Sequence, residues 1–193
     1  MSAPSPWRWR RPAAPTGESQ CATVDGWPIP CVLEHIPAVE SVLSEVARVL
    51  KPGGLFAFSV PAPRLLAVAA ETHPADPSGF VEAFNERVEH RNVWSAERWA
   101  AALAAAGLLV HDIRGFMPPD AAAAWFEAYD WVVRPIRGRG ALYRLAGPGL
   151  RRFGLGRALA SYWRRRLTPW AGRGVSASLE EACALFVTAK RPG

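Results

Sequence analysis

The adjacent side chains Glu34 and His35 are the first candidates for chemistry in this sequence. A histidine exchanges a proton near neutral pH, so His35 is a candidate general base. The same two residues could instead cap the helix that follows them and fix a turn. Residue type and position are compatible with both a catalytic and a structural role. The position of Glu34 and His35 relative to the neighbouring helices and strands has to distinguish the two.

His90 is a second candidate, because residues 88–92 lead into another predicted helix and such connecting segments often line substrate pockets. A histidine at the protein surface would show the same local pattern. His73 and His111 are isolated in the sequence. The chain contains neither an HExxH motif nor a Cys-x-x-Cys pair, and we therefore expect no metal site.

Residues 32–61 combine a turn, an amphipathic helix and a buried strand. Apolar residues recur over 39–50 with the three-four spacing of one helical face. Lys51 suits a helix C-terminus, Pro52 cannot continue the helix, and Gly53 can adopt the positive φ that ends it. The apolar run 55–60, closed by Pro61, predicts a central strand.

Further elements follow along the chain. Residues 61–92 are expected to form a long lid-like loop with a short helix over 65–71 and a turn cluster at 73–79. Ser95 is a plausible N-cap for a helix over 96–106, and Gly107 a plausible residue to end it. The segments 108–116 and 184–189 each predict a strand.

The sequence words VLEHI, EVARVLKPGG and FSVP, in this order and at this spacing, resemble the class I S-adenosylmethionine-dependent methyltransferases. In that family the first word follows the fourth strand, the second closes the next helix, and the third is the fifth strand. The segments 108–116 and 184–191 resemble the sixth and last strands, which form an antiparallel pair at the sheet edge. The resemblance covers residues 32–116 and 179–191.

This resemblance implies an α/β fold with an incomplete Rossmann-like sheet, in which strands five, six and seven are clear. It also implies methyl transfer from S-adenosylmethionine to a small-molecule or lipid-like acceptor. The reaction is an in-line attack that depends mostly on positioning, with at most one general base. Glu34 and His35 would face the methionine end of the cofactor, with His35 as the candidate catalytic base and His90 as a candidate substrate contact.

The sequence departs from the family in its first 31 residues. No strand followed by a glycine-rich loop occurs there, and no acidic residue stands where the family binds the ribose. Residues 1–24, rich in proline and arginine, are expected to be disordered. Residues 25–30 are expected to be a loop, with the fourth strand shortened or deleted. The chain is therefore expected to be a truncated, impaired or inactive methyltransferase that binds the cofactor weakly.

A missing fourth strand would leave strand 55–60 at the edge of the sheet. Its backbone groups would be unpaired, which favours self-association or pairing with a partner chain. Residues 25–193 would then form one partial methyltransferase-like domain. No apolar segment follows the first arginines, and three distant cysteines suit a reducing compartment, so a cytoplasmic location is expected.

Residues 117–178 are expected to form an arginine-rich helical insertion before the last strand. The segment 131–179 contains eleven arginines and no Asp, Glu or Lys, and helices are expected over 120–134 and 155–167. Three interpretations are open: a solvated helical cap over the sheet, an interfacial helix on anionic lipid, and phosphate or nucleic-acid binding, of which nucleic acid is the least expected. The candidate anion- or substrate-binding residues are Arg157, Trp163, Arg164 and Arg165.

The insertion also supports an alternative function. A non-catalytic module built on these arginines would bind an anionic ligand or lie peripherally on a membrane surface. No segment approaches the roughly 20 apolar residues that a membrane-spanning helix needs. Integral insertion into a membrane is therefore not expected.

Overall fold

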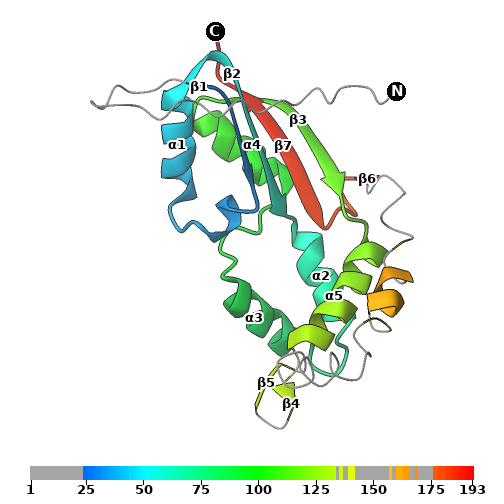
Figure 1. Ribbon diagram of the computed structural model, residues 1–193. Coiled ribbons are helices and arrows are strands. Elements are labelled where there is room, and N and C mark those ends of the chain that lie inside the picture. The colour runs from blue at the N-terminus through cyan, green and yellow to red at the C-terminus, as the bar shows by residue number, and fades with distance from the viewer. Residues whose placement is uncertain are drawn as a thin grey trace, which may run out of the picture.

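A five-stranded sheet with the strand order β1-β2-β7-β3-β6 organises the fold (Figure 1). The computed structural model describes residues 24–133, 135–136, 139–141, 157, 160–165, 168 and 176–193. The strands of this sheet are β1 (Val24–Pro30), β2 (Leu50–Pro61), β3 (Leu109–Phe116), β6 (Ser176–Ala177) and β7 (Ala184–Lys190). The short strands β4 (Pro135–Ile136) and β5 (Arg139–Ala141) pair with each other.

Helices fill the connections between these strands. They are the three-residue 3-10 helix η1 (Leu33–His35), α1 (Val39–Val49), α2 (Pro63–Glu71), α3 (Pro77–Val88), α4 (Ala96–Ala105) and α5 (Pro119–Val133). Helices α1, α2 and α4 confirm the corresponding sequence predictions. The Ser95 side chain accepts a hydrogen bond from the Arg98 backbone N–H, and Gly107 has a φ of +79°, so the predicted cap and stop of α4 are also confirmed.

Strand β7 lies between β2 and β3 and runs antiparallel to both. Phe58 pairs with Val187, and Val187 pairs with Ile113 on the other side. This arrangement confirms the predicted antiparallel pair formed by the sixth and last strands. The fold is therefore the α/β, Rossmann-like sheet expected from the sequence.

The prediction that residues 25–30 form a loop, with the fourth strand shortened or deleted, is wrong. Residues 24–30 form β1, which pairs in parallel with β2, with Gly26 opposite Leu55 and Pro30 opposite Ser59. Strand 55–60 is thus paired on both sides and is not an exposed edge, so the basis for partner-chain pairing at this strand is removed. Within the described sheet, the edges are β1 on one side and, on the other, β6 with the part of β3 that β6 leaves unpaired.

Backbone alternation explains how a proline-rich segment can be an edge strand. The Cys31 N–H donates to the Ser59 carbonyl at 3.0 Å, so alternate N–H groups of β1 face β2. The intervening positions, Pro28 and Pro30, face away from β2, where a missing N–H costs no hydrogen bond. Because Pro28 and Pro30 have no backbone N–H, the outer edge of β1 also offers few hydrogen-bond donors to a further strand.

The expectation of a long lid-like loop over 61–92 is wrong in its second half, which contains α3. The Asp76 side chain accepts a hydrogen bond from the Gly79 N–H at 3.0 Å, and Pro77 occupies the first helical turn. These are standard helix-start features, although Asp and Pro are also typical of turns. Helix α3 ends at Glu89, which adopts the left-handed conformation with φ of +55°.

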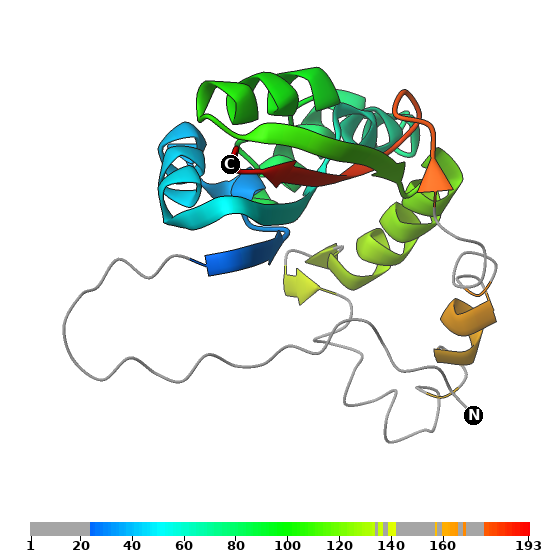
Figure 2. The same cartoon turned by 90° about the horizontal axis from the view of Figure 1, so that it is seen from above.

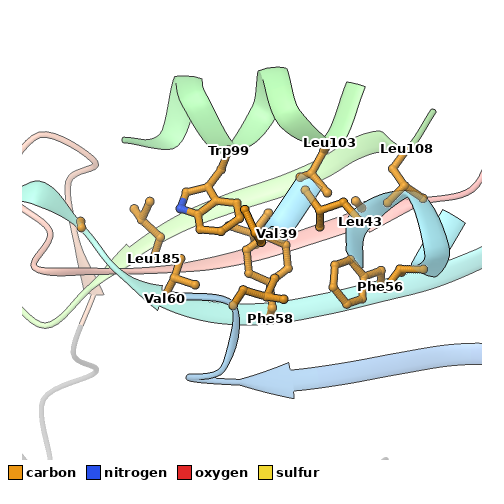
Figure 3. Close-up of a cluster of buried hydrophobic side chains, with 14 of the residues drawn as sticks. Val39, Leu43, Phe56, Phe58, Val60, Trp99, Leu103, Leu108 and Leu185 are labelled. Carbon is orange, nitrogen blue, oxygen red and sulfur yellow. The ribbon is translucent and has the colours of Figure 1, made fainter. Parts of the chain in front are cut away.

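The largest buried cluster lies between one face of the sheet and helices α1 and α4 (Figure 3). Figure 2 shows α4 lying along this face of the sheet. Phe58 on β2 meets Trp99 on α4 edge to face, with ring centroids 5.2 Å apart, and both side chains are fully buried. This contact fixes β2, and therefore the end of β2 that faces the candidate site, against the helical layer.

The insertion is described only in part. Helix α5 confirms the first predicted helix of this segment, and of the second the structure describes residues 157 and 160–165, all helical. Residues 1–23 and the remainder of the insertion lie outside the described residues, so the predicted disorder and domain limits stay predictions. Among the described helices, none has the length and apolarity required to cross a membrane.

The burial of Cys183 gives a prediction about thiol reactivity. Cys183 is fully buried, and burial raises the pKa of its thiol to about 11 from an ordinary value of 9.0. Cys31 is exposed. Because the thiolate is the reactive form, iodoacetamide at pH 8 should modify Cys31 at least about 100-fold faster than Cys183 in the folded protein.

Peptide mapping by mass spectrometry would follow each thiol separately. In concentrated urea the two rates should become similar, because burial is lost. Comparable rates for the two cysteines in the folded protein would contradict the placement of Cys183 in the core.

Candidate active site

The turn that carries Glu34 and His35 starts where β1 ends. Cys31 has a left-handed φ of +49°, which turns the chain out of the strand and into η1. Because β1 and β2 are parallel, both strands end at the same edge of the sheet, and η1 lies at that edge (Figure 1). The carboxyl edge of such a sheet is where α/β proteins usually bind their ligands.

Residues 91 and 92 hold this turn from the other side. The backbone N–H groups of Arg91 and Asn92 both donate to the Glu34 carbonyl, at 2.7 and 3.0 Å. The Asn92 side-chain amide donates to the carbonyls of Leu33 and Ile36, at 2.8 and 2.7 Å. Asn92 is buried, so these four bonds give η1 partners that water does not replace.

His90 is brought against His35 by these hydrogen bonds. The two imidazole rings stack with centroids 5.4 Å apart and an interplanar angle of 29°. His35 Nε2 lies 3.8 Å from Glu34 Oε1, and His35 Nδ1 lies 3.3 Å from the Glu89 carbonyl oxygen. The Phe84 and His90 rings pack edge to face, with ring centroids 5.6 Å apart. One carboxyl group and two imidazoles therefore share one small site.

Two polar atoms of this site have no hydrogen-bond partner among the described residues. They are Glu34 Oε2 and His90 Nδ1, and both are buried. Glu34 as a whole is only 2% exposed, whereas the His35 side chain is 38% exposed. A buried acceptor without a partner costs free energy, so these atoms mark a place where a ligand atom would be favourable.

Burial also sets the protonation of the site. It raises the pKa of Glu34 above its ordinary value, and the nearby His35 only partly opposes this effect. Burial, together with repulsion from His35, lowers the pKa of His90 from 6.5 to about 4. At neutral pH the His90 imidazole is therefore neutral, and its unprotonated ring nitrogen can accept a hydrogen bond or bind a ligand.

The sequence candidates fall into two groups in the structure. Glu34, His35 and His90 come together, although 55 positions separate His35 from His90. Arg157, Arg164 and Arg165 are exposed and helical, and Figures 1 and 2 place their segment on the other side of the molecule, beside α5. Trp163 packs edge to face with Tyr162 in the same segment. A membrane-surface or anionic-ligand role for these residues stays a prediction.

Asn92, whose side chain donates two hydrogen bonds to the η1 turn, was not among the residues predicted from the sequence. A lone asparagine before an apolar residue carries no sequence signal for burial. The short spacing from His90 to Ser95, which leaves little free chain before α4, was the only local hint. Its importance depends on contacts with residues more than 50 positions earlier.

Comparison with known proteins agrees with this fold. Residues 31–113 match the family model described as a methyltransferase domain. The matched segment, which contains Glu34, His35 and His90, is therefore similar to methyltransferase domains. No curated protein sequence matches the chain significantly.

Several solved structures are similar at low identity. The [4+2]-cyclase SpnF shares 16% identity, with 89% of this chain and 50% of that chain covered and a TM-score of 0.44. Phosphoethanolamine N-methyltransferase 2 of Haemonchus contortus, in complex with S-adenosyl-L-methionine, shares 14% identity, with 88% and 33% covered and a TM-score of 0.45. Geranyl diphosphate C-methyltransferase of Streptomyces coelicolor shares 16%, with 87% and 46% covered and a TM-score of 0.42. The chain spans half or less of the length of these three structures.

Removing the Asn92 side chain should destabilise the protein through the site. In Asn92→Ala, the Ile36 carbonyl loses its side-chain donor and the Leu33 carbonyl keeps only the 3.4 Å bond from the Ile36 N–H. We expect the free energy of unfolding to fall by about 2–3 kcal/mol. Urea unfolding followed by tryptophan fluorescence would measure the change.

Asn85→Ala is the matched control. The Asn85 side-chain oxygen has no partner among the described residues, so its removal should cost less than about 1 kcal/mol. If both variants lost the same free energy, the account of Asn92 as the residue that holds η1 would be wrong.

Proposed function

We propose that this chain provides the acceptor side of a methyltransferase that transfers a methyl group from S-adenosylmethionine to a small-molecule or lipid-like acceptor. The observation that carries the proposal is the convergence of Glu34, His35 and His90 at the carboxyl edge of β1 and β2. All three lie within the segment that matches the methyltransferase domain. The site thus combines a family-typical position with groups able to bind and to move protons.

The residues present fit one end of the cofactor. Glu34 Oε2 is a buried acceptor without a partner among the described residues, and the methionine end of S-adenosylmethionine carries an ammonium group that could donate to it. When bound, the cofactor supplies an electrophilic methyl group. The partly exposed His35 would then accept the proton of an incoming acceptor, while the Glu89 carbonyl and the His90 ring hold its imidazole in place.

We expect the affinity of this polypeptide for the cofactor to be weak. The sequence carries no glycine-rich loop after a strand and no acid placed for the ribose, so adenosine contributes little binding energy. Methyl transfer by residues 1–193 alone should be impaired for the same reason. Contacts with the methionine end remain, and these should be measurable at high ligand concentration.

The four histidines of the chain provide a direct binding assay. Titration with S-adenosylhomocysteine should shift the imidazole C–H signals of His35 and His90 in NMR spectra and leave those of His73 and His111 unchanged. We expect a dissociation constant near the millimolar range, corresponding to about −4 kcal/mol. Adenosine, which lacks the amino-acid end, is the control ligand and should shift the same signals much less.

Two results would contradict the proposal. Absence of shifts at about 10 mM ligand would exclude even binding of the methionine end, because occupancy would then exceed half for a millimolar constant. Equal shifts at all four histidines would show that binding is not located at the candidate site. Micromolar affinity would refute the weak binding and indicate that adenosine is held by other residues.

A further inference from the structure

The cluster of Glu34, His35 and His90 has a donor set that methyl transfer does not by itself require. Each residue offers one ligand-type atom, and these atoms lie within 4.8 Å of one another. Among the described residues, these three form the one group of histidine, cysteine and acidic side chains close enough to hold a metal ion together. The sequence prediction of no metal site rested on motifs with close spacing, and His90 joins the pair only through the fold.

The geometry is close to what one metal ion needs. Metal–nitrogen and metal–oxygen bonds of about 2.0–2.2 Å put neighbouring ligand atoms roughly 3–3.5 Å apart. Glu34 Oε1 and His35 Nε2 are already 3.8 Å apart. Small rotations of the side chains would close the remaining gaps, while the backbone stays held by the Asn92 hydrogen bonds.

Burial provides a second, independent observation. Glu34 is only 2% exposed, yet its Oε2 atom has no hydrogen-bond partner among the described residues. His90 Nδ1 is a buried nitrogen in the same condition. A bound cation would satisfy both atoms, and metal-binding groups need free lone pairs of this kind.

We propose that Glu34, His35 and His90 bind a divalent transition metal ion such as Zn²⁺. Two imidazoles and one carboxylate favour Zn²⁺, Co²⁺, Ni²⁺ or Fe²⁺ over Mg²⁺ and Ca²⁺, which prefer all-oxygen sites. Three protein ligands leave at least one coordination position open. That position would lie on the exposed side of His35, where water or another ligand atom can reach it.

The metal proposal does not rest on the proposed methyl transfer, because metal binding requires neither cofactor nor acceptor. An ion held by Glu34 and His35 would compete with the roles proposed for these side chains in that reaction. The test uses the full chain with its thiols kept reduced. Equilibrium dialysis against Zn²⁺ should give one ion per chain with a micromolar dissociation constant. Zn²⁺ in excess should also raise the unfolding temperature, since the ion binds the folded state.

Variants assign the site. Glu34→Gln and His90→Gln should each weaken Zn²⁺ binding by at least about tenfold, whereas the matched control His111→Gln should bind as the unmodified chain does. Since Glu34 is buried and His90 half-buried, circular dichroism without metal must first establish that these variants fold. If Glu34→Gln or His90→Gln does not fold, His35→Gln is the variant that tests Zn²⁺ binding at the site, because His35 is partly exposed and its replacement should not prevent folding.

Co²⁺ adds a spectroscopic readout. Its visible absorption should report nitrogen and oxygen ligands without the charge-transfer band of a thiolate. Less than about 0.2 ions per chain at 100 µM Zn²⁺ would overturn the proposal, because a micromolar site would be nearly saturated there. Three other results would also overturn the proposal. They are unchanged Zn²⁺ binding in all folded site variants, a thiolate band in the Co²⁺ spectrum, and preference for Mg²⁺ over Zn²⁺.

Discussion

The hydrogen bonds between residues 91–92 and the η1 turn are the constraint on which the candidate site depends. One carbonyl, that of Glu34, accepts two backbone N–H groups, and the Asn92 amide holds two further carbonyls of the same turn. Bonds of this kind are individually modest, but leaving their buried partners unsatisfied is expensive. The free-energy cost of breaking these bonds keeps residues 91–92 against the η1 turn, although the two segments are far apart in sequence. His90 therefore lies next to Glu34 and His35.

The sheet supplies the fixed frame for this contact. Strand β2 is paired on both sides and packed through Phe58 against Trp99, so its carboxyl end has little freedom. Strand β1 follows it in parallel and delivers η1 to the same edge. Because Glu34 is then buried, next to His35 and His90, its carboxyl group is destabilised in the charged form, which favours partners that bring positive charge. The electrostatics of the site are therefore a consequence of the strand arrangement.

Local pattern was sufficient for much of the fold. The helices α1 and α4 and the strands β2, β3 and β7 have clear periodicity or apolar runs, and the predicted cap and glycine stop of α4 match the structure. Helix α1 instead ends at Val49, and the predicted stop residues Lys51, Pro52 and Gly53 lie in β2. Strand β1 could not be predicted in this way, because Gly26, Pro28 and Pro30 have low strand propensity and extension depends on pairing with β2. Helix α3 was missed although Asp76 and Pro77 form a recognisable helix start, since the same two residues also favour turns.

The candidate site was predictable only in part, for a related reason. Glu34, His35 and His90 were each selected by type and local position, but nothing in a single sequence says that residues 34–35 and 90 meet. Asn92 was not selected at all, because its role depends on carbonyl groups that the fold places beside it. Long-range hydrogen bonds of this kind depend on the tertiary structure, and no periodic pattern of residues in the sequence indicates them.

The central claim is that the His35 and His90 rings lie against each other in the folded chain. A nuclear Overhauser measurement between their imidazole C–H protons tests this directly, without any ligand or activity. With ring centroids 5.4 Å apart, a cross-peak between the two rings is expected, and the Phe84–His90 contact at 5.6 Å provides an internal reference. A clear Phe84–His90 cross-peak without one between His35 and His90 would contradict the account.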